Sequence, residues 1–123
     1  MSIRVDEALG VHVRALDLRM QRSEILAANL ANEDTPGFKA RDIDFAGEMS
    51  RLSSSFNAQL ASASSLDASQ LKYRVPTQPS QDGNSVELSV EQAEFSRNSM
   101  DFQTSLTFLS MKFRGLKQAI EGR

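Results

Sequence analysis

The chain has 123 residues, of which 40% are hydrophobic and 7% aromatic, and its 14 basic and 16 acidic side chains leave a net charge of −2. This length predicts one domain with a small core, and the charge balance offers no basic face for nucleic acid. Because the sequence contains no cysteine, it excludes disulfides and thiolate metal sites.

The amino terminus reads MSIRVDEALG and has neither the apolar core nor the small-residue cleavage site of a secretory signal. No run along the chain approaches the ~20 apolar residues of a membrane helix. If the protein works outside the cytosol, we therefore expect it to leave by a route that needs no cleaved signal.

The first predicted element is a helix over residues 6–31. Its apolar residues recur at alternating spacings of four and three, which is typical of a heptad seam with one polar member. The seam comprises Leu9, Val13, Leu16, Met20, Ser23, Ala27 and Leu30. A second row with the same spacing lies on nearly the opposite face and comprises Val11, Ala15, Leu18, Arg22 and Ile25.

A rigid turn followed by extended chain is predicted over residues 32–45. Asn29 and Asn32 lie three residues apart on one side of the helix end, where asparagine suits a C-terminal cap. Thr35 precedes a proline and is therefore displaced from helical conformation. Pro36–Gly37 suits the centre of a type II turn, because glycine tolerates the positive φ of the second position. Phe38 is then expected to fold back onto the helix.

The middle of the chain is predicted to carry little regular structure. Residues 46–70 are rich in serine and alanine and predict a flexible, weakly ordered connection or a marginal helix, because these side chains bury too little to offset the entropy of ordering. Residues 71–88 contain Pro76, Pro79 and the sequence Asp-Gly-Asn from Asp82, which favour extended chain and turns.

The last predicted element is a helix over residues 89–121. Ser89 and Gln92 fit a capping box at its start, and Gly122 stands where a helix-terminating glycine is expected. Its seam comprises Phe95, Ser99, Phe102, Leu106, Leu109, Phe113, Leu116 and Ile120. A second row comprises Met100, Thr104, Phe108 and Met111.

Together these elements predict an all-α fold in which two long terminal helices pair as an antiparallel, coiled-coil-like core, joined by an extended, turn-rich or flexible middle. Pairing through the two seams would leave outer apolar residues exposed, and exposed stripes of this kind usually mark an interaction surface. These outer residues are Val11, Leu18, Ile25, Met100, Phe108 and Met111. The alternative is that the middle folds back over the second faces and completes a small helical bundle.

Catalytic, cofactor-binding and metal-binding patterns are not found in the sequence. His12 is the only histidine and is expected to be a surface or packing residue. Asp42 and Asp44 would share one face of a strand, as paired carboxylates can in acid–base or cation sites. No further ligand stands near them and Arg41 offsets their charge, so a solvated face is expected. The sequence from Asp82 lacks the carboxylate spacing of a calcium loop.

The stretch ANLANEDTPGFKARDIDF at residues 28–45 resembles the motif that follows the first helix in the rod and hook proteins of the bacterial flagellum. The matching motif positions are Asn29, Ala31, Asn32, Thr35, Pro36, Gly37, Phe38 and Lys39. Residues 40–45 and 71–120 are similar to the proximal-rod branch of this family, whereas residues 46–70 carry no resemblance.

The resemblance implies a structural subunit without enzyme activity or cofactor. Members pair their terminal helices into an elongated core, and the cores pack into a helical tube around an export channel and transmit torque. The implied partners are copies of the chain, other rod proteins, the adapter to the membrane ring and the type III export gate. The implied location is the periplasmic rod of the basal body, reached without a cleaved signal.

A short export-gate element is a further implication of the resemblance. Early export substrates of this system often carry a Phe followed four residues later by a hydrophobic residue, and Phe45 and Met49 fit that pattern. Alternatively, Phe45 simply anchors the loop to the helices.

The alternative for the whole chain is a small helical adapter or chaperone that binds an amphipathic partner in a groove.

Overall fold

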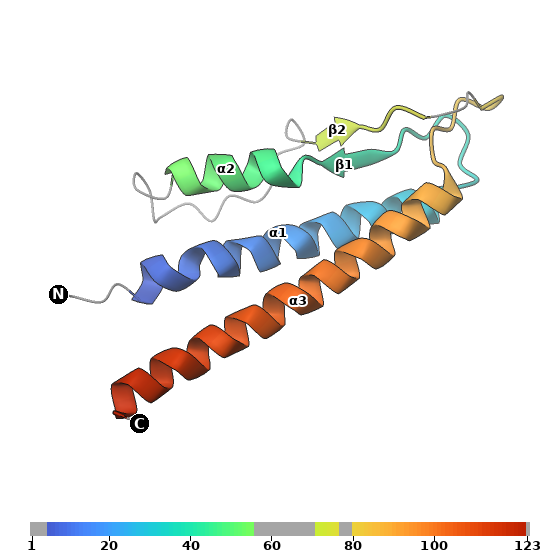
Figure 1. Cartoon of the computed structure of the whole chain (residues 1–123). Coiled ribbons are helices and arrows are strands. Elements are labelled where there is room, and N and C mark those ends of the chain that lie inside the picture. Colours follow the sequence, from blue (N-terminus) through green and yellow to red (C-terminus); the bar gives the residue numbers. More distant parts are fainter. Residues whose placement is uncertain (1–4, 56–70, 77–79, 123) are drawn as a thin grey trace.

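The computed structural model of the chain describes residues 5–55, 71–76 and 80–122. In chain order its elements are α1 (Val5–Ala31), β1 (Arg41–Ile43), α2 (Phe45–Ser55), β2 (Leu71–Tyr73) and α3 (Leu88–Glu121). Figure 1 shows α1 and α3 as two long helices, with the short elements on one side of them. Among the described helices, none combines the length and the apolar character needed to cross a membrane.

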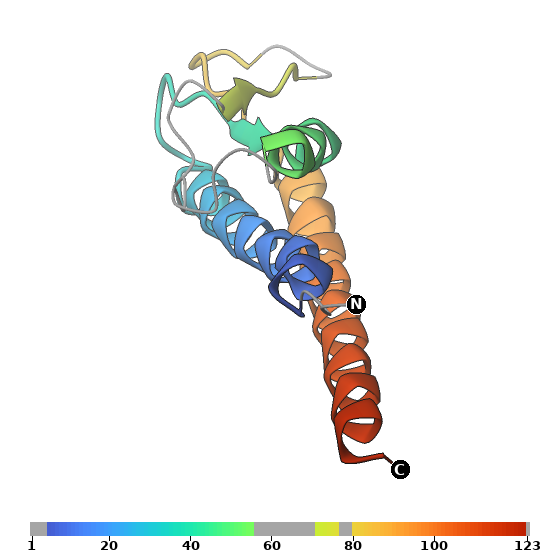
Figure 2. The ribbon, with the colours of Figure 1, turned by 90° about the vertical axis from the view of Figure 1, so that its left-hand side faces the viewer.

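The two long helices pair in antiparallel fashion, which confirms the predicted all-α class. The N-terminal end of α1 and the C-terminal end of α3 lie at the same end of the molecule, and α1 packs along α3 (Figure 1). At about 1.5 Å per residue, the 27 residues of α1 span ~40 Å and the 34 residues of α3 span ~51 Å. Figure 2 accordingly shows the end of α3 running past the beginning of α1.

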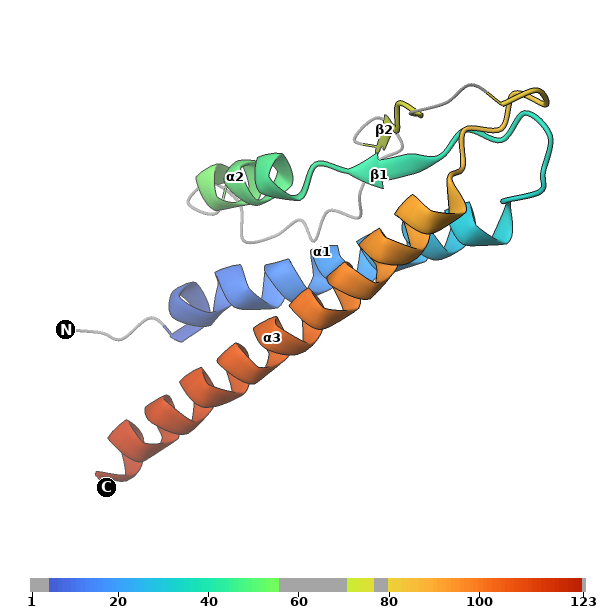
Figure 3. The same cartoon turned by 45° about the vertical axis from the view of Figure 1, so that its right-hand side comes forward.

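The described part of the middle folds back as a second layer. Strands β1 and β2 pair antiparallel with Arg41 opposite Tyr73 and Ile43 opposite Leu71, and both β1 and α2 pack against α1 (Figure 3). Helix α2 forms where a flexible connection or a marginal helix was expected, and residues 56–70 of that segment lie outside the described residues. The fold-back alternative therefore holds for residues 41–55.

A local cap explains why α2 begins where it does. The backbone carbonyl of Asp44 accepts the Glu48 N–H at 2.9 Å, and its carboxylate accepts the Gly47 N–H at 3.3 Å. Aspartate is among the best N-cap residues because its side chain satisfies a backbone donor that the first helical turn leaves free. The serine-rich segment after Asp44 thus starts as a helix despite its weak apolar pattern.

The core of the described chain is small and half polar. Its buried apolar side chains are Leu9, Leu18, Leu26, Ala40, Ile43 and Leu109. Leu26 is fully buried although it belongs to neither predicted row, and the expected exposure of Leu18 is wrong, since that side chain is 3% exposed. The reason is the second layer: α1 has neighbours on two sides, so its buried arc is wider than a seam made for one partner helix.

The predicted seam is buried only in part. Leu9 and Leu109 are buried, and Leu16, Phe95, Phe102 and Leu116 are half-buried. Six seam residues are instead exposed, which are Val13, Met20, Ala27, Leu106, Phe113 and Ile120. A strict heptad drifts by ~20° per repeat around a straight helix, and α1 does not reach far enough to cover the end of α3. Both effects bring seam residues to the surface.

Of the two predictions for the ends of α3, the one for its start is wrong and the one for its end is confirmed. The expected capping box is wrong, because Ser89 lies inside the helix and the N-cap position is Glu87, in extended conformation without a side-chain cap. Gly122 is confirmed as the terminating glycine: its φ is 70° and its N–H donates to the Gln118 carbonyl. A left-handed residue at this position satisfies a carbonyl that the last turn leaves free.

Candidate functional site

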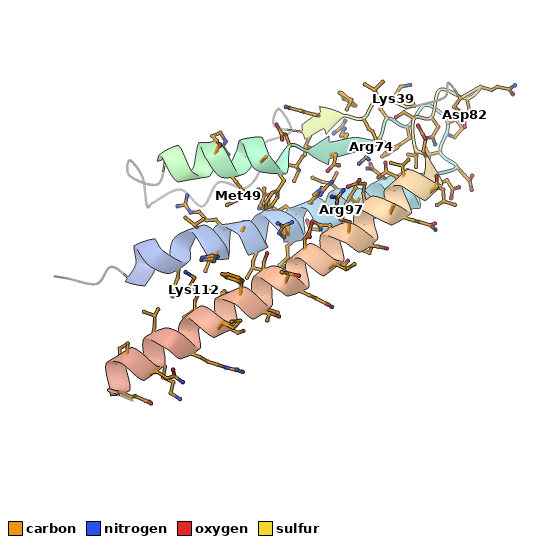
Figure 4. All side chains as sticks on the ribbon, in the orientation of Figure 1. Lys39, Met49, Arg74, Asp82, Arg97 and Lys112 are labelled. Atoms are coloured by element: carbon orange, nitrogen blue, oxygen red, sulfur yellow. The ribbon has the colours of Figure 1, made fainter. Side chains whose placement is uncertain are left out.

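The candidate site is the end of the molecule where α1 stops and α3 begins. Two loops meet there, residues 32–40 after α1 and residues 80–87 before α3. We call these loops, together with Asn29 at the end of α1, the joint. Figure 4 places Lys39 and Asp82 at this end of the molecule, with Lys112 toward the other end.

The turn in the first loop is the one that the sequence predicts. The Phe38 N–H donates to the Thr35 carbonyl at 3.3 Å, which makes Pro36 and Gly37 the two central residues. Gly37 has a φ of +74°. Because proline fixes a negative φ at the first central position, a positive φ at the second defines a type II turn.

Asn32 ends α1, as expected from its position. Its side-chain amide donates to the Ala28 carbonyl at 2.7 Å, and its side-chain oxygen accepts the Thr35 hydroxyl at 3.1 Å. These bonds add a second donor to the Ala28 carbonyl, which also accepts the Asn32 N–H, and they tie the helix end to the residue before the proline. Asn32 is half-buried, and both partners of its side chain lie within four residues of it along the chain, so it acts as a local cap.

Asn29 has a different role from the helix closure expected for it. Its side chain is 1% exposed. It donates to the Arg41 carbonyl at 2.7 Å and accepts the Arg41 N–H at 3.1 Å, so the amide pairs with both backbone groups of one β1 residue. It also donates to Glu91 Oε2 on α3 at 3.0 Å. One buried side chain thus joins α1, β1 and α3.

The second loop supplies a partner that the sequence did not reveal. The Asn84 side-chain amide lies 2.9, 2.7 and 2.8 Å from the carbonyls of Asn32, Glu33 and Thr35, and its oxygen accepts the Val86 N–H at 2.7 Å. Asn84 thus holds three carbonyls of the loop that follows α1, of which those of Asn32 and Thr35 also accept backbone N–H groups. The Asp-Gly-Asn sequence indicated a turn but carried no sign of its partner.

The two loops are also joined along their backbones. The Gly37 N–H donates to the Asp82 carbonyl and the Ser85 N–H to the Phe38 carbonyl, each at 2.9 Å. Ser85 accepts the Ala40 N–H on its hydroxyl at 2.7 Å, and the Lys39 ammonium donates to the Gly83 carbonyl. The joint is therefore a small hydrogen-bonded structure that fixes where the chain leaves α1 and enters α3.

Beside the joint lies a group of charged side chains that we call the ion cluster, comprising Arg22, Asp42, Arg74, Glu91 and Glu94. Arg22 binds both oxygens of Asp42, at 2.9 and 3.0 Å, and donates to Glu94 at 2.8 Å. Arg74 donates to Asp42 at 2.7 Å, and its Nε lies 3.0 Å from Glu91 Oε1 without hydrogen-bond alignment. The cluster connects α1, β1, the residue after β2, and α3.

The two aspartates near β1 do not form a site together, and the solvated face expected for Asp42 is wrong. Asp42 is half-buried between Arg22 and Arg74. Asp44 is exposed, caps α2 and lies 3.3 Å from the Lys72 ammonium. Within the described residues, no group of three acidic or histidine side chains is arranged to hold a metal ion.

The balance of charge in the ion cluster is uneven, with three carboxylates against two guanidinium groups. Burial raises the pKa of the Glu91 carboxyl above its ordinary value, against the opposing effects of the Asn29 hydrogen bond and the Arg74 charge. The hydrogen bond from Arg22 to Asp42 raises the pKa of that guanidinium. Burial therefore makes the ionised form of Glu91 costly for the fold.

The raised pKa predicts how stability responds to pH. Glu91 binds its proton more tightly in the folded chain than in the unfolded chain, so this contribution to stability is complete below the ordinary pKa of the carboxyl. It is lost as the pH rises through the raised value. Glu91→Gln mimics the protonated form and is expected to unfold at higher denaturant than the wild type at pH ~7, with the gap closing as the pH falls.

Asp44→Asn is the control with the opposite sign. The Gly47 N–H and then Lys72 lower the pKa of Asp44, so its contribution is present above the ordinary pKa and disappears on acidification. Denaturant titrations of the three chains across the acid range measure both differences. A gap between the wild type and Glu91→Gln that widens toward low pH contradicts the assignment.

A further set of polar contacts fixes the register of α1 against α3. Asn98 is fully buried and donates to the Arg19 carbonyl at 2.9 Å and to the Ser23 hydroxyl at 2.8 Å. Arg19 lies 3.4 Å from Asp101 and 4.0 Å above the Phe45 ring, so it also holds α2. Because these partners must meet in pairs, a shift of one residue along either helix breaks them.

The remaining predicted residues lie away from the joint. Phe45 and Met49 are half-buried on α2. His12 stacks on Phe108 with ring centroids 6.0 Å apart, as expected of a packing residue. Of the predicted outer residues, Ile25 is half-buried, whereas Val11, Met100, Phe108 and Met111 are exposed by 39%, 69%, 52% and 61%.

Comparison with known proteins places this arrangement in a family. The profile of the family described as "Flagella basal body rod protein" matches residues 9–39, which include most of α1 and most of the first loop of the joint. The chain is 44% identical to the "Flagellar basal body rod protein FlgB" of Salmonella typhimurium over 136 aligned positions, covering 97% of this chain and 96% of the relative.

Two further relatives match over the same extent. The protein of the same name from Aeromonas hydrophila is 44% identical, with 99% of this chain and 98% of the relative covered. That of Escherichia coli is 39% identical, with 96% of each chain covered. The aligned region thus spans nearly the whole chain, and the chain belongs to the flagellar basal body rod protein family.

Proposed function

We propose that this chain is a structural subunit of the flagellar basal-body rod, at its proximal end, and has no enzyme activity. The observation that carries the proposal is the similarity over nearly the whole chain to relatives named as flagellar basal body rod proteins. In this role the subunits assemble with other rod proteins into a helical tube around the export channel and transmit torque.

The physical character of the fold supports a role in transmitting torque. The long helices are held by paired polar contacts rather than by a large apolar core, so their register and the path of the chain are specified. Several large apolar side chains are nevertheless exposed along both helices. A single copy leaves these surfaces uncovered, as expected for a chain whose neighbours complete its packing.

We infer that the whole chain acts as one elongated unit whose exposed motif residues meet neighbouring subunits. Asn29 is committed to contacts within the chain. The motif positions that remain exposed are Ala31, Thr35, Pro36, Gly37 and Lys39. Their place at one end of the helix pair suits a contact between subunits stacked along the rod.

The proposed partners follow from this role. They are further copies of the chain, other rod proteins, the adapter to the membrane ring and the type III export gate. The proposed location is the periplasmic rod, reached by export without a cleaved signal. A small helical adapter or chaperone would also expose apolar stripes, but it has no need of a rigid joint.

Phe45 and Met49 are proposed as the element that the export gate reads. Replacing both with serine is expected to lower the amount of chain secreted by a flagellated host while its cellular level stays the same. Arg19→Leu is the control, because it removes the contact on the Phe45 ring and leaves residues 45–49 intact. An equal loss of secretion in the control assigns the effect to folding and contradicts the proposal.

Deletion and fractionation test the function itself. A strain lacking the chain is expected to be non-motile and to lack rods, and the wild-type chain supplied from a plasmid should restore both. The chain should also copurify with basal bodies extracted in detergent, whereas an adapter or chaperone would stay in the soluble fraction. A motile deletion strain with normal hooks overturns the proposal.

A further inference from the structure

The C-terminal end of α3 is exposed on every side. From residue 110 to residue 122 only Leu116 is even half-buried. We call residues 110–122 the tip. Its large apolar side chains include Met111, Phe113 and Ile120, which are 61%, 51% and 80% exposed. A bare helix with apolar groups around it is marginal in water, because most helical stability comes from packing.

The tip is also basic. Lys112, Arg114 and Lys117 are exposed, and Glu121 is the one acidic residue of the tip. The tip therefore carries apolar and positively charged groups together. A surface that covers it should offer apolar contacts and negative charge.

The exposed face of α1 has that complementary chemistry. Six exposed residues follow one another at spacings of four and three and so lie on one face of the helix. We call them the α1 stripe, which comprises Val13, Asp17, Met20, Glu24, Ala27 and Ala31. Among residues 9–31, every exposed side chain is apolar or acidic, whereas the arginines of α1 are half-buried.

The tip cannot reach the stripe of its own chain. Helix α3 is continuous from Leu88 to Glu121 and lies antiparallel to α1, so its last turns run away from the body of α1. Figure 2 shows this end of α3 projecting past the beginning of α1. The length of the tip, ~20 Å, fits within the ~27 Å of the stripe. A stripe that covers the tip therefore belongs to another molecule.

We propose that the basic, apolar tip of one copy docks on the acidic, apolar α1 stripe of a second copy. The two surfaces differ and lie at different places on the chain, so the contact is head-to-tail and leaves a free tip and a free stripe for further copies. Such heterologous contacts build rings or helical assemblies. The inference deepens the proposed function, on which it rests, by naming the surfaces through which copies meet.

Because the chain has no cysteine, disulfide capture can detect this contact even when it is weak. Gln118→Cys places a thiol on the tip and Ala27→Cys places one on the stripe, and both positions are exposed. When the two purified full-length variants are mixed under oxidation, tip-to-stripe dimers should exceed tip-to-tip and stripe-to-stripe dimers. Gln103→Cys, exposed on α3 outside the tip, is the matched control and should not be captured by the stripe.

Charge reversal gives the second arm. The tip variant is K112E/R114E/K117E and the stripe variant is D17K/E24K, and each is made with Gln118→Cys and, separately, with Ala27→Cys. When the two thiol forms of one variant are mixed, tip-to-stripe capture should be lost, because the reversed surface now has the same sign of charge as its partner. A mixture of the two reversed variants should recover it, because each tip again faces a stripe of opposite charge. Arg97→Glu reverses an exposed charge on α3 outside the tip and should leave capture unchanged.

Three results overturn the inference. One is capture that favours like pairs, and another is a mixture of reversed variants that fails to recover. The third is wild-type tip that binds vesicles containing phosphatidylserine and is not captured by the stripe, which makes a lipid surface the occupant. None of these bears on the deletion and fractionation tests, so a rod subunit that assembles through other surfaces remains distinguishable from a chain that is no rod subunit.

Discussion

Asn29→Ala is expected to lower the free energy of unfolding by about 2–4 kcal/mol, because it leaves several buried groups without partners. The N–H and carbonyl of Arg41 both lose the side-chain amide that pairs with them. Glu91, which is 0% exposed, loses the hydrogen bond from Asn29 to its Oε2. The cavity that the substitution leaves offers no hydrogen-bond partner to the Arg41 backbone groups or to the Glu91 carboxylate.

Asn32→Ala is the matched control, three residues further along the same motif. Its amide donates to one carbonyl near the surface and accepts one hydroxyl, so its loss should cost about 0.5–1 kcal/mol. Urea denaturation followed by circular dichroism measures both variants, with the same osmolyte added to all samples so that each starts folded. Equal losses for the two asparagines would show that Asn29 is only another helix cap.

Gly37→Val is expected to impair assembly far more than it changes the helix content of the free chain. Gly37 holds a φ of +74°, and a Cβ added there would meet nothing within 4 Å. The cost is therefore backbone strain rather than a clash, about 1–3 kcal/mol for a residue that avoids this conformation. Relief of that strain would displace the Gly37 N–H from Asp82 and separate the two loops.

Gly37→Asn is the control that separates the effect of backbone strain from the effect of adding any side chain at this position. Asparagine visits positive φ more readily than other residues do, so this variant should keep most of the motility that Gly37→Val loses. Swimming assays and the amount of chain in detergent-extracted basal bodies measure assembly, and far-ultraviolet circular dichroism measures the helix content of the purified chain. Equal motility of Gly37→Val and the wild type would reduce the turn to an ordinary loop.

Local features of the joint follow from the sequence because single residues impose them. Proline fixes its own φ, and glycine accepts the positive φ that follows, so Pro36–Gly37 determine the turn wherever the chain goes next. The same reasoning explains Gly122 at the end of α3. The period of the apolar residues likewise predicts both long helices, since it depends only on spacing along the chain.

Long-range partners could not be read in the same way. Asn29 meets Glu91 across 62 residues, and Asn84 meets the end of α1 across about 50. The sequence around each of these residues gives no indication of its distant partner. The alternating pattern around Asp42 similarly predicts a solvated strand residue, because the sequence gives no sign of the contacts with Arg22 and Arg74 that come from other elements.

By itself, the sequence therefore determined the two helices, the turn between α1 and β1, and the family. Only the tertiary structure decided which polar groups are shared, why Leu18 and Leu26 are buried, and which faces of α1 and α3 remain exposed. The physical reason is the range of the forces involved. Backbone preferences and helical periodicity act over a few residues, whereas burial and hydrogen-bond pairing depend on which segments meet in space.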